Sequence, residues 1–330
     1  MTDLQGATAA AATPAEAVAP AALPMPSARR RRRPSRKFIE LVVLIGPALV
    51  LFAGFVLLPI CIAAYYGLFN WTGYGPLSDF TGLHNYKLVL GDPVFRSSLL
   101  HNVIIAVLSL VIQLPISVAI ALLLNRRMRG ASFLRLAVFA PYVVSQATTA
   151  VLWLLLLEPG GFVDQLMKAV GLGGLVQEWL ADPTIVLYTM FVVLTWQFIG
   201  FGVILLLAGL QGIPPELREA AAIDGASAWQ TTRRITLPLL SPTVRIWIFL
   251  SMIGSLQVFD LVWIMTLGGP ANASSTMVTY MIFFGFRSLE FGYGSAAAVI
   301  LFVISFVFAY LYQRFALRRD TEGALTRAVG

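Results

Sequence analysis

The stretch Ile213–Pro242, IPPELREAAAIDGASAWQTTRRITLPLLSP, is a long polar interruption between two apolar segments of membrane length. It opens with Pro214 and Pro215, which suit the first turn of a helix because the N–H groups there have no partner within the helix. Further on, Gly225 can adopt the left-handed conformation that ends many helices. We therefore predict a short helix over residues 215–223, with acidic side chains near its positive N-terminal end.

A second helix is predicted directly after this glycine. Ser227 and Gln230 have the spacing of a capping box, in which each side chain bonds the backbone N–H of the other residue. Pro238 lacks the N–H that a helix interior needs, so we expect this helix to end near Leu237. The loop is therefore expected to consist of two ordered helices joined by a glycine elbow.

The composition places the chain in a membrane. Of its 330 residues, 58% are hydrophobic and only 12% are charged, which is too little polar surface to cover a soluble domain. The net charge of +7 would be compatible with nucleic-acid binding, but the basic residues follow the loops instead of forming one patch. The lone cysteine, Cys61, excludes an intramolecular disulfide.

Long apolar segments predict an all-α, polytopic membrane protein with six transmembrane helices. These helices cover approximately residues 39–65, 102–124, 133–157, 184–210, 244–266 and 294–317. We expect Pro47, Pro59 and Pro141 to kink them, with neighbouring helices satisfying the freed carbonyls. Residues 277–286 are apolar but too few to span a bilayer, which favours a surface or re-entrant segment on the outer side.

Three regions are predicted along the chain. Residues 1–37 are rich in alanine, proline and arginine and are expected to be a disordered cytoplasmic tail. The basic block in this tail, next to the first apolar segment, favours binding to anionic lipid over binding to nucleic acid. Residues 38–319 are expected to form the transmembrane domain, which contains the loop 213–242, and residues 320–330 a second cytoplasmic tail.

The distribution of basic residues predicts the orientation in the membrane. If both termini and the loop 213–242 face the cytoplasm, four of the 23 Lys and Arg residues lie outside, namely Lys87, Arg96, Lys168 and Arg287. Such an asymmetry is the positive-inside signal of a membrane protein whose two termini are cytoplasmic.

The sequence contains no recognisable motif for catalysis or metal binding. It lacks the phosphate-binding pattern GxxxxGK followed by Ser or Thr, so no ATP hydrolysis is expected in this chain. Its two histidines, His84 and His101, do not have the spacing of metal ligands. We therefore expect neither enzymatic activity nor a bound metal or cofactor.

Asp260 is the acidic residue that these boundaries place within a transmembrane helix. An unpaired charge at mid-bilayer costs roughly 2.5–3.5 kcal/mol on insertion scales, so a partner or a wet cavity is expected. Gln257 and Trp263 lie three residues to either side and share its helical face, so the three could line a translocation path. The alternative is that Asp260 lies near the outer interface and is hydrated there. Trp196 and Gln197 form a second candidate pair for the path. The alternative is that they serve only in helix packing.

The loop 213–242 resembles a known functional motif. It is similar to the EAA loop of permease subunits in binding-protein-dependent ABC importers. The similarity lies in Glu219-Ala220-Ala221, Asp224-Gly225-Ala226, Ile235, Leu237-Pro238 and Pro242. Thr232 departs from the family pattern, which commonly has phenylalanine at this position. The resemblance implies that the loop is a coupling helix docked on an ATPase, with the contacts made by Glu219, Ala220, Ala221, Ile223, Asp224, Gly225, Ala226 and Pro238.

Other segments resemble the carbohydrate branch of this family, in particular its maltose-type first permease subunit. They are Phe80-Thr81-Gly82-Leu83, Asn85-Tyr86, Gly268-Gly269-Pro270 and Phe291-Gly292-Tyr293. The resemblance implies a type I importer in the bacterial plasma membrane, with a second permease subunit, two ATPase subunits that hold ATP and Mg, and an extracytoplasmic solute-binding protein. Its solute would be a disaccharide, an oligosaccharide or a glycerol phosphate.

Two other classes of function stay open. An ion-coupled secondary transporter would need acidic residues within the membrane, for which Asp260 is the candidate, and its transport would not depend on ATP. A membrane-bound enzyme or scaffold would act without a solute-binding protein.

Overall fold

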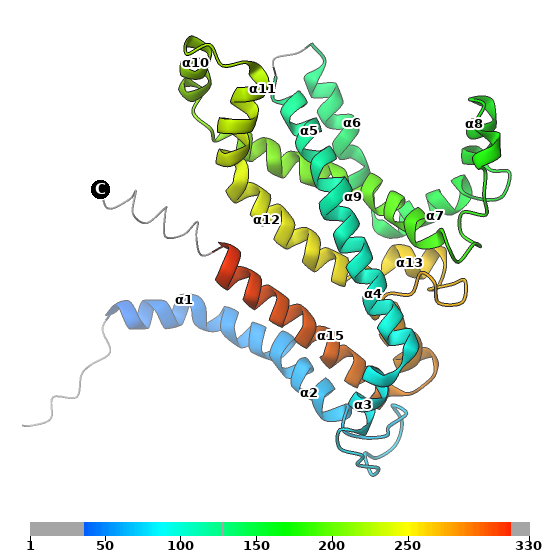
Figure 1. Cartoon of the computed structure of the whole chain (residues 1–330). Helices are drawn as coiled ribbons and strands as arrows, with labels where there is room; N and C mark the ends of the chain where they lie inside the picture. The colour runs from blue at the N-terminus through cyan, green and yellow to red at the C-terminus, as the bar shows by residue number, and fades with distance from the viewer. Residues whose placement is uncertain (1–35, 127–128, 318–330) are drawn as a thin grey trace, which may run out of the picture. The chain divides into compact units, whose positions relative to one another are not determined.

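The computed structural model describes residues 36–126 and 129–317, which are largely helical (Figure 1). The tails predicted over residues 1–37 and 320–330 lie outside the described residues, apart from the first two residues of α1. The chain divides into two compact units between Ala53 and Gly54. In the described part of the first unit, α1 (Arg36–Phe52) is a single helix that contains Pro47.

The second unit holds the other helices. In chain order they are α2 (Leu58–Tyr66), α3 (His84–Gly91), α4 (Pro93–Leu108), α5 (Leu114–Leu124), α6 (Ala131–Val143), α7 (Gln146–Leu156), α8 (Phe162–Ala169), α9 (Val186–Gln211), α10 (Glu216–Ile223), α11 (Ala228–Thr231), α12 (Leu237–Leu256), α13 (Asp260–Met265), α14 (Met277–Ile282) and α15 (Phe291–Tyr312). Between α2 and α3, Phe69 and Phe80 form an isolated antiparallel bridge.

Within the described residues, five helical segments are long and apolar enough to cross a membrane. They are Val43–Tyr66, Pro93–Leu124, Val186–Gln211, Ala228–Met265 and Phe291–Ala316. The bent pair of α6 and α7 gives a sixth span if it counts as one, which agrees with the six that the sequence predicts. The second span begins at Pro93 and not near Asn102, because the Asp92 side chain caps its first turn by accepting the N–H groups of Val94 and Phe95.

Three prolines, Pro59, Pro115 and Pro238, lie within continuous helix. Three Leu-Pro pairs directly follow five-residue π-helical segments, namely Leu58-Pro59 after Ala53–Leu57, Leu114-Pro115 after Ser109–Gln113 and Leu237-Pro238 after Thr232–Thr236. A proline ring clashes with the carbonyl four residues before it in an α-helix, and the wider π turn relieves this clash. The N–H of Leu237 accordingly bonds the carbonyl of Thr232, five residues back. The prediction that Pro238 ends the second loop helix is therefore wrong, because residues 228–256 are continuously helical.

Two predicted spans are broken, one close to the break predicted at Pro141 and one at a position that the sequence did not indicate. α6 and α7 meet at an angle of 99°, and the two residues between them lie just after the kink expected at Pro141. The predicted helix over residues 244–266 ends at Leu256 and resumes at Asp260, so the expectation of one unbroken helix there is wrong. Each break frees backbone carbonyls, which need other hydrogen-bond donors in a membrane.

The helix α9 is the centre of the packing in the second unit. α5, α6 and α12 all pack against it, whereas α15 packs against α2 and α3 (Figure 1). Gly200 lets α6 approach α9 closely, because a Cβ at this position would lie 2.3 Å from the carbonyl oxygen of Val138. Small residues at such crossings are typical of membrane helices, which associate through close backbone packing.

Gly200→Ala is therefore expected to destabilise the protein. Overpacking of this kind costs about 1–3 kcal/mol, which thermal unfolding of the purified protein in detergent would detect. Gly254→Ala in α12 is the matched control, because its added methyl group meets no atom within 4 Å. An unchanged unfolding temperature for Gly200→Ala would contradict the close crossing of α6 and α9.

A buried carboxylate orders the segment between α7 and α9. The Asp164 side chain accepts hydrogen bonds from Trp179 Nε1 at 2.8 Å and from the Gly160 N–H at 2.8 Å. These two bonds, with the Trp179 bond the stronger influence, lower the pKa of Asp164 below its ordinary value, and nearby Lys168 acts in the same direction. The ionised carboxylate is therefore the form that this fold stabilises.

A lowered pKa in the folded state predicts how this segment depends on pH. Its stabilising effect is complete above the ordinary pKa of about 3.9 and is lost as the pH falls through the lower pKa of the folded state. At pH 7, Asp164→Asn is expected to speed limited proteolysis between residues 157 and 183, whereas Glu178→Gln, at an exposed position of the same segment, leaves it unchanged. Equal proteolysis of both variants would remove this role from Asp164.

Candidate functional site

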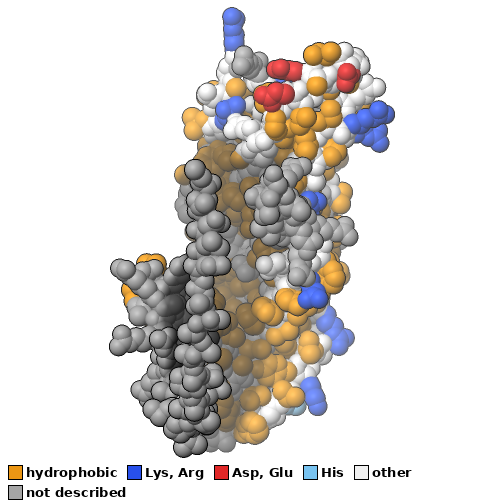
Figure 2. All heavy atoms as spheres, turned by 90° about the vertical axis from the view of Figure 1, so that its left-hand side faces the viewer, with side chains coloured by type: hydrophobic (Ala, Val, Ile, Leu, Met, Phe, Trp, Pro, Cys, Tyr) orange, Lys and Arg blue, Asp and Glu red, His pale blue; other side chains and the backbone are white. Residues whose placement is uncertain are grey.

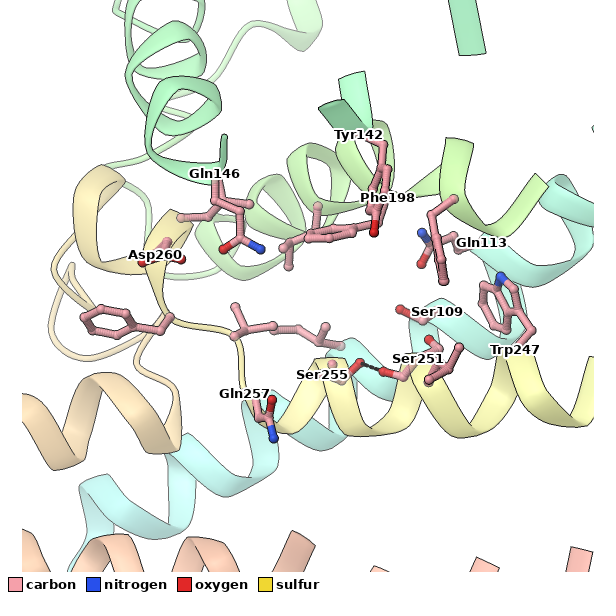
Figure 3. A pocket seen from close by; sticks show the side chains of 18 residues that line it. Ser109, Gln113, Tyr142, Gln146, Phe198, Trp247, Ser251, Ser255, Gln257 and Asp260 are labelled. Atoms are coloured by element: carbon pink, nitrogen blue, oxygen red, sulfur yellow. Dashed lines mark hydrogen bonds between the residues drawn. The ribbon is translucent and has the colours of Figure 1, made fainter. Parts of the chain in front are cut away.

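A cavity of about 400 Å³ lies where α12 and α13 face α9 and the junction of α6 with α7 (Figure 3). Its walls come from segments far apart in the sequence. At one end, Figure 3 shows Gln146, Gln257 and Asp260, and at the other end it shows Ser109, Gln113, Trp247 and Ser251. Tyr142 and Phe198 form part of the wall between the two ends.

The lining combines neutral hydrogen-bonding groups with aromatic rings. Tyr142 stacks on Phe201, with 5.2 Å between the ring centroids and 27° between the planes. Amide and hydroxyl side chains both donate and accept hydrogen bonds. Asp260 is the acidic residue of the lining, which contains no Lys or Arg. This cavity therefore suits an uncharged, hydroxyl-rich solute.

The first break, between α6 and α7, contributes Tyr142 and Gln146 to the lining. Ser145 caps α7, because its Oγ accepts the N–H of Thr148 at 3.2 Å. The carbonyl of Val144 accepts a hydrogen bond of 3.1 Å from Gln197 Nε2, a side chain of α9 that is 2% exposed. The bend is therefore held from outside its own helices.

The second break, between α12 and α13, contributes Gln257 and Asp260 to the lining. The carbonyl of Ser255 accepts a bond of 2.6 Å from Asn102 Nδ2, and that of Val258 accepts one of 2.7 Å from Thr276 Oγ1. Both donor side chains are fully buried. This break, too, is held by side chains from neighbouring elements.

The candidate path residues divide into two groups. Gln257 and Asp260 line the cavity, with Asp260 exposed at the first turn of α13, where a carboxylate suits the positive end of a helix. Trp263, Trp196 and Gln197 lie outside the lining.

The three residues outside the lining make other contacts. Trp263 packs on Phe259 with 5.4 Å between centroids, and Trp196 packs on Trp153 at 5.6 Å. Gln197 holds the first break instead. The shared face inferred for Gln257, Asp260 and Trp263 assumed one unbroken helix, and the break removes that relation.

Most of the polar lining was not predicted as a site. The residues that were missed lie in segments whose sequence predicts membrane spans, and they are Ser109, Gln113, Tyr142, Gln146 and Ser251. A usable signal was present, because Gln113 is a polar residue directly before a Leu-Pro pair and ends a π-helical segment. Such segments often occur at functional sites.

The loop 213–242 forms α10 and the start of a second helix as its caps predict, although this second helix continues past Pro238. α10 ends in a Schellman motif, in which Ala226 N–H bonds the Ala221 carbonyl at 2.9 Å and Gly225 N–H bonds that of Ala222 at 3.1 Å. Gly225 has a φ of +78°, as a left-handed stop requires. The capping box of Ser227 and Gln230 is also confirmed. Thr232, the position that departs from the family pattern, begins the π-helical segment after α11.

This loop presents a mixed surface to its surroundings, with exposed apolar and acidic side chains and the exposed Arg218, Arg233 and Arg234. Ile223 is 86% exposed and Trp229 is 68% exposed. Figure 2 shows acidic, basic and apolar side chains together at the end of the molecule where α10 and α11 lie. Exposed as well are Glu219, Ala220, Asp224, Gly225 and Pro238, whereas Ala226 is half-buried and Ala221 is buried. Such a surface suits a protein partner.

Comparisons with known proteins point to one family. Residues 88–321 match the family described as the inner membrane component of binding-protein-dependent transport systems. A probable ABC transporter permease protein of Pyrococcus horikoshii is 36% identical over 286 residues, which cover 86% of this chain and 97% of that protein. The trehalose/maltose transport system permease protein MalF of Thermococcus litoralis is 32% identical, with 84% and 94% covered.

A solved structure has the same fold. It is the bacterial alginate ABC transporter in complex with an alginate pentasaccharide-bound periplasmic protein, and one of its chains superposes with a TM-score of 0.74 at 22% identity. The superposition covers 86% of this chain and 96% of the other.

Proposed function

Because the chain belongs to the family of binding-protein-dependent transport system inner membrane components, we propose that it is the permease subunit of an ATP-driven ABC importer for a sugar. The observation that carries the proposal is a cavity of hydroxyl, amide and aromatic groups between membrane-length helices. An extracytoplasmic binding protein would deliver the sugar to this cavity. The protein would lie in the bacterial plasma membrane with both termini in the cytoplasm.

The cavity favours a neutral saccharide. Sugar hydroxyls would exchange hydrogen bonds with groups such as Gln113, Gln146 and Ser251, and the apolar face of a sugar ring would pack on Tyr142 or Trp247. A uronic acid would meet the Asp260 carboxylate with no cation in the lining. A uronate that bound the cavity as well as its neutral analogue would contradict this part of the proposal.

The loop 213–242 would couple ATP hydrolysis in the ATPase subunits to movement of the permease. Two ATPase subunits that hold ATP and Mg, one beneath each of two permease subunits, would grip α10 through its exposed Ile223 and acidic side chains. The Schellman motif and the capping box make the loop stiff enough to transmit a displacement. Closure of the ATPases would then switch the cavity between inward and outward access.

An ion-coupled mechanism is not favoured, because the family is defined by dependence on a binding protein. The direct test is purification of the intact complex from native membranes through a tag on this chain. We expect a second permease, an ATPase and a binding protein that carries a neutral sugar. Sugar uptake that persists in ATP-depleted vesicles would overturn the proposal.

Variants at the glycine elbow test the role of the loop. Gly225→Pro removes the left-handed stop and Glu219→Lys reverses a charge on the exposed face, so both are expected to abolish uptake although the protein still inserts. Gly225→Asn is the control, because asparagine tolerates a positive φ and should retain most of the uptake. The readouts are membrane content and ATP-dependent sugar uptake, and normal uptake by the first two variants would remove the coupling role.

Variants of Tyr142 test the cavity. Tyr142→Ala removes an aromatic wall and is expected to lower kcat/KM for uptake about tenfold, or roughly 1.4 kcal/mol. Tyr142→Phe keeps the stacked ring and should stay within about threefold of the parent protein. Tyr188→Ala, which removes an exposed ring elsewhere on the chain, is the control for general damage. Equal effects of Tyr142→Ala and Tyr188→Ala would place the solute elsewhere.

A further inference from the structure

The cavity is built at two helix breaks, and each break is held by a buried amide from another helix. We propose that Asn102 and Gln197 are positioning residues, each of which fixes the lining residues of one break by donating a hydrogen bond to a freed carbonyl. The link to transport rests on the proposed function, whereas the structural role does not.

Asn102 ties the end of α12, where the second break begins, to the start of α14. Its Nδ2 donates to Ser255 O at the end of α12, and its Oδ1 accepts the N–H of Met277 at the start of α14 at 2.9 Å. Asn102 is 0% exposed, so water does not compete for either bond. The residues that follow Ser255 include Gln257 and Asp260, both in the cavity lining.

Neighbouring polar groups reinforce this junction. Ser98 Oγ donates to Ser275 Oγ at 2.9 Å, and His101 Nδ1 lies 2.8 Å from the carbonyl oxygen of Ser275. Ser98, His101 and Asn102 are all residues of α4, so one turn of a single helix anchors the segment before α14 and the end of α12 together. The break is therefore a built feature and not a frayed helix end.

Gln197 holds the first break from α9. Its Nε2 donates to Val144 O, in the two-residue link between α6 and α7, close to Tyr142 and Gln146, which both line the cavity. Its Oε1 has no hydrogen-bond partner among the described residues, so the bond to Val144 is the polar contact that this buried amide makes there. Val144 is extended, with a ψ of 137°, and its carbonyl is therefore turned away from the helical direction.

The same physical reason explains why both breaks need a buried amide. A freed carbonyl within a membrane span has no water to bond, so losing its donor favours rewinding of the break into continuous helix. Rewinding would rotate the adjacent lining residues away from the cavity, because side-chain direction changes by about 100° for each residue of a helix. An uncharged donor satisfies the carbonyl without burying a charge.

Cysteine reporters can separate this role from general destabilisation. In the full transporter with Cys61→Ala as background, Gln146→Cys reports the first break and Gln257→Cys reports the second, through their rates of reaction with a small methanethiosulfonate reagent. Gln197→Leu is expected to change the rate at position 146 by at least about tenfold and that at position 257 by less than about twofold. Asn102→Leu should show the reverse pattern. Each leucine variant is expected to change exposure locally, at its own break.

The control is Ser117→Ala, which deletes a fully buried hydroxyl that has no hydrogen-bond partner in the described part of the chain. It should move neither rate. The proposal is overturned if each leucine variant changes both reporters alike, or if neither variant changes its own reporter. Uptake is measured in parallel, and a crossed labelling pattern with unchanged uptake would support the positioning role while removing the cavity from the transport path.

Discussion

The structure depends on one constraint, which is that a backbone carbonyl in the membrane must find a donor when its helix is interrupted. The chain meets this constraint in two ways. At the Leu-Pro pairs, a π-helical segment shifts the bonding by one residue and the helix continues. At the two breaks, the buried side chains of Asn102, Gln197 and Thr276 supply the donors. The π-helical segments allow long continuous helices, and the breaks form the cavity.

The two solutions meet in the helix that links the loop to the cavity. It starts at the Ser227 cap, passes Pro238 through the π-helical segment and ends at Leu256, a rod of roughly 40 Å at 1.5 Å per residue. One end carries the exposed surface of α10 and α11, and the other carries Ser251 and Gln257 of the lining. A displacement of the loop would therefore reach the cavity through a single element.

The sequence predicted the parts of this fold that depend on local chemistry. Helix caps at Ser227, the stop at Gly225 and the number of apolar segments all follow from neighbouring residues, and the structure agrees with them. The break before Asp260 was missed because nothing in its own segment marks it. The carbonyl of Ser255, where it begins, is bonded by Asn102, which lies more than 150 residues earlier and has the pattern of an ordinary residue of a membrane helix.

The same reason explains the mixed outcome at the cavity. Asp260 was predicted from its charge within an apolar segment and Gln257 from its spacing to Asp260, whereas Tyr142 and Gln146 reach the cavity only because α6 and α7 bend by 99°. Gln197 was selected for its polarity in an apolar segment, but its amide bonds a carbonyl instead of facing the solute. A polar residue within a membrane span thus has a structural or functional role, and the tertiary contacts determine which of the two it is.

The most direct test of the account is the side from which Ser251→Cys is labelled in the assembled transporter. The readout is its reaction with a membrane-impermeant thiol reagent added to either face of sealed vesicles, with Cys61→Ala as background and the ATPase either nucleotide-free or trapped with ATP. The account predicts labelling from the cytoplasmic face without nucleotide and from the outer face with ATP. Labelling from the same face in both states would contradict it.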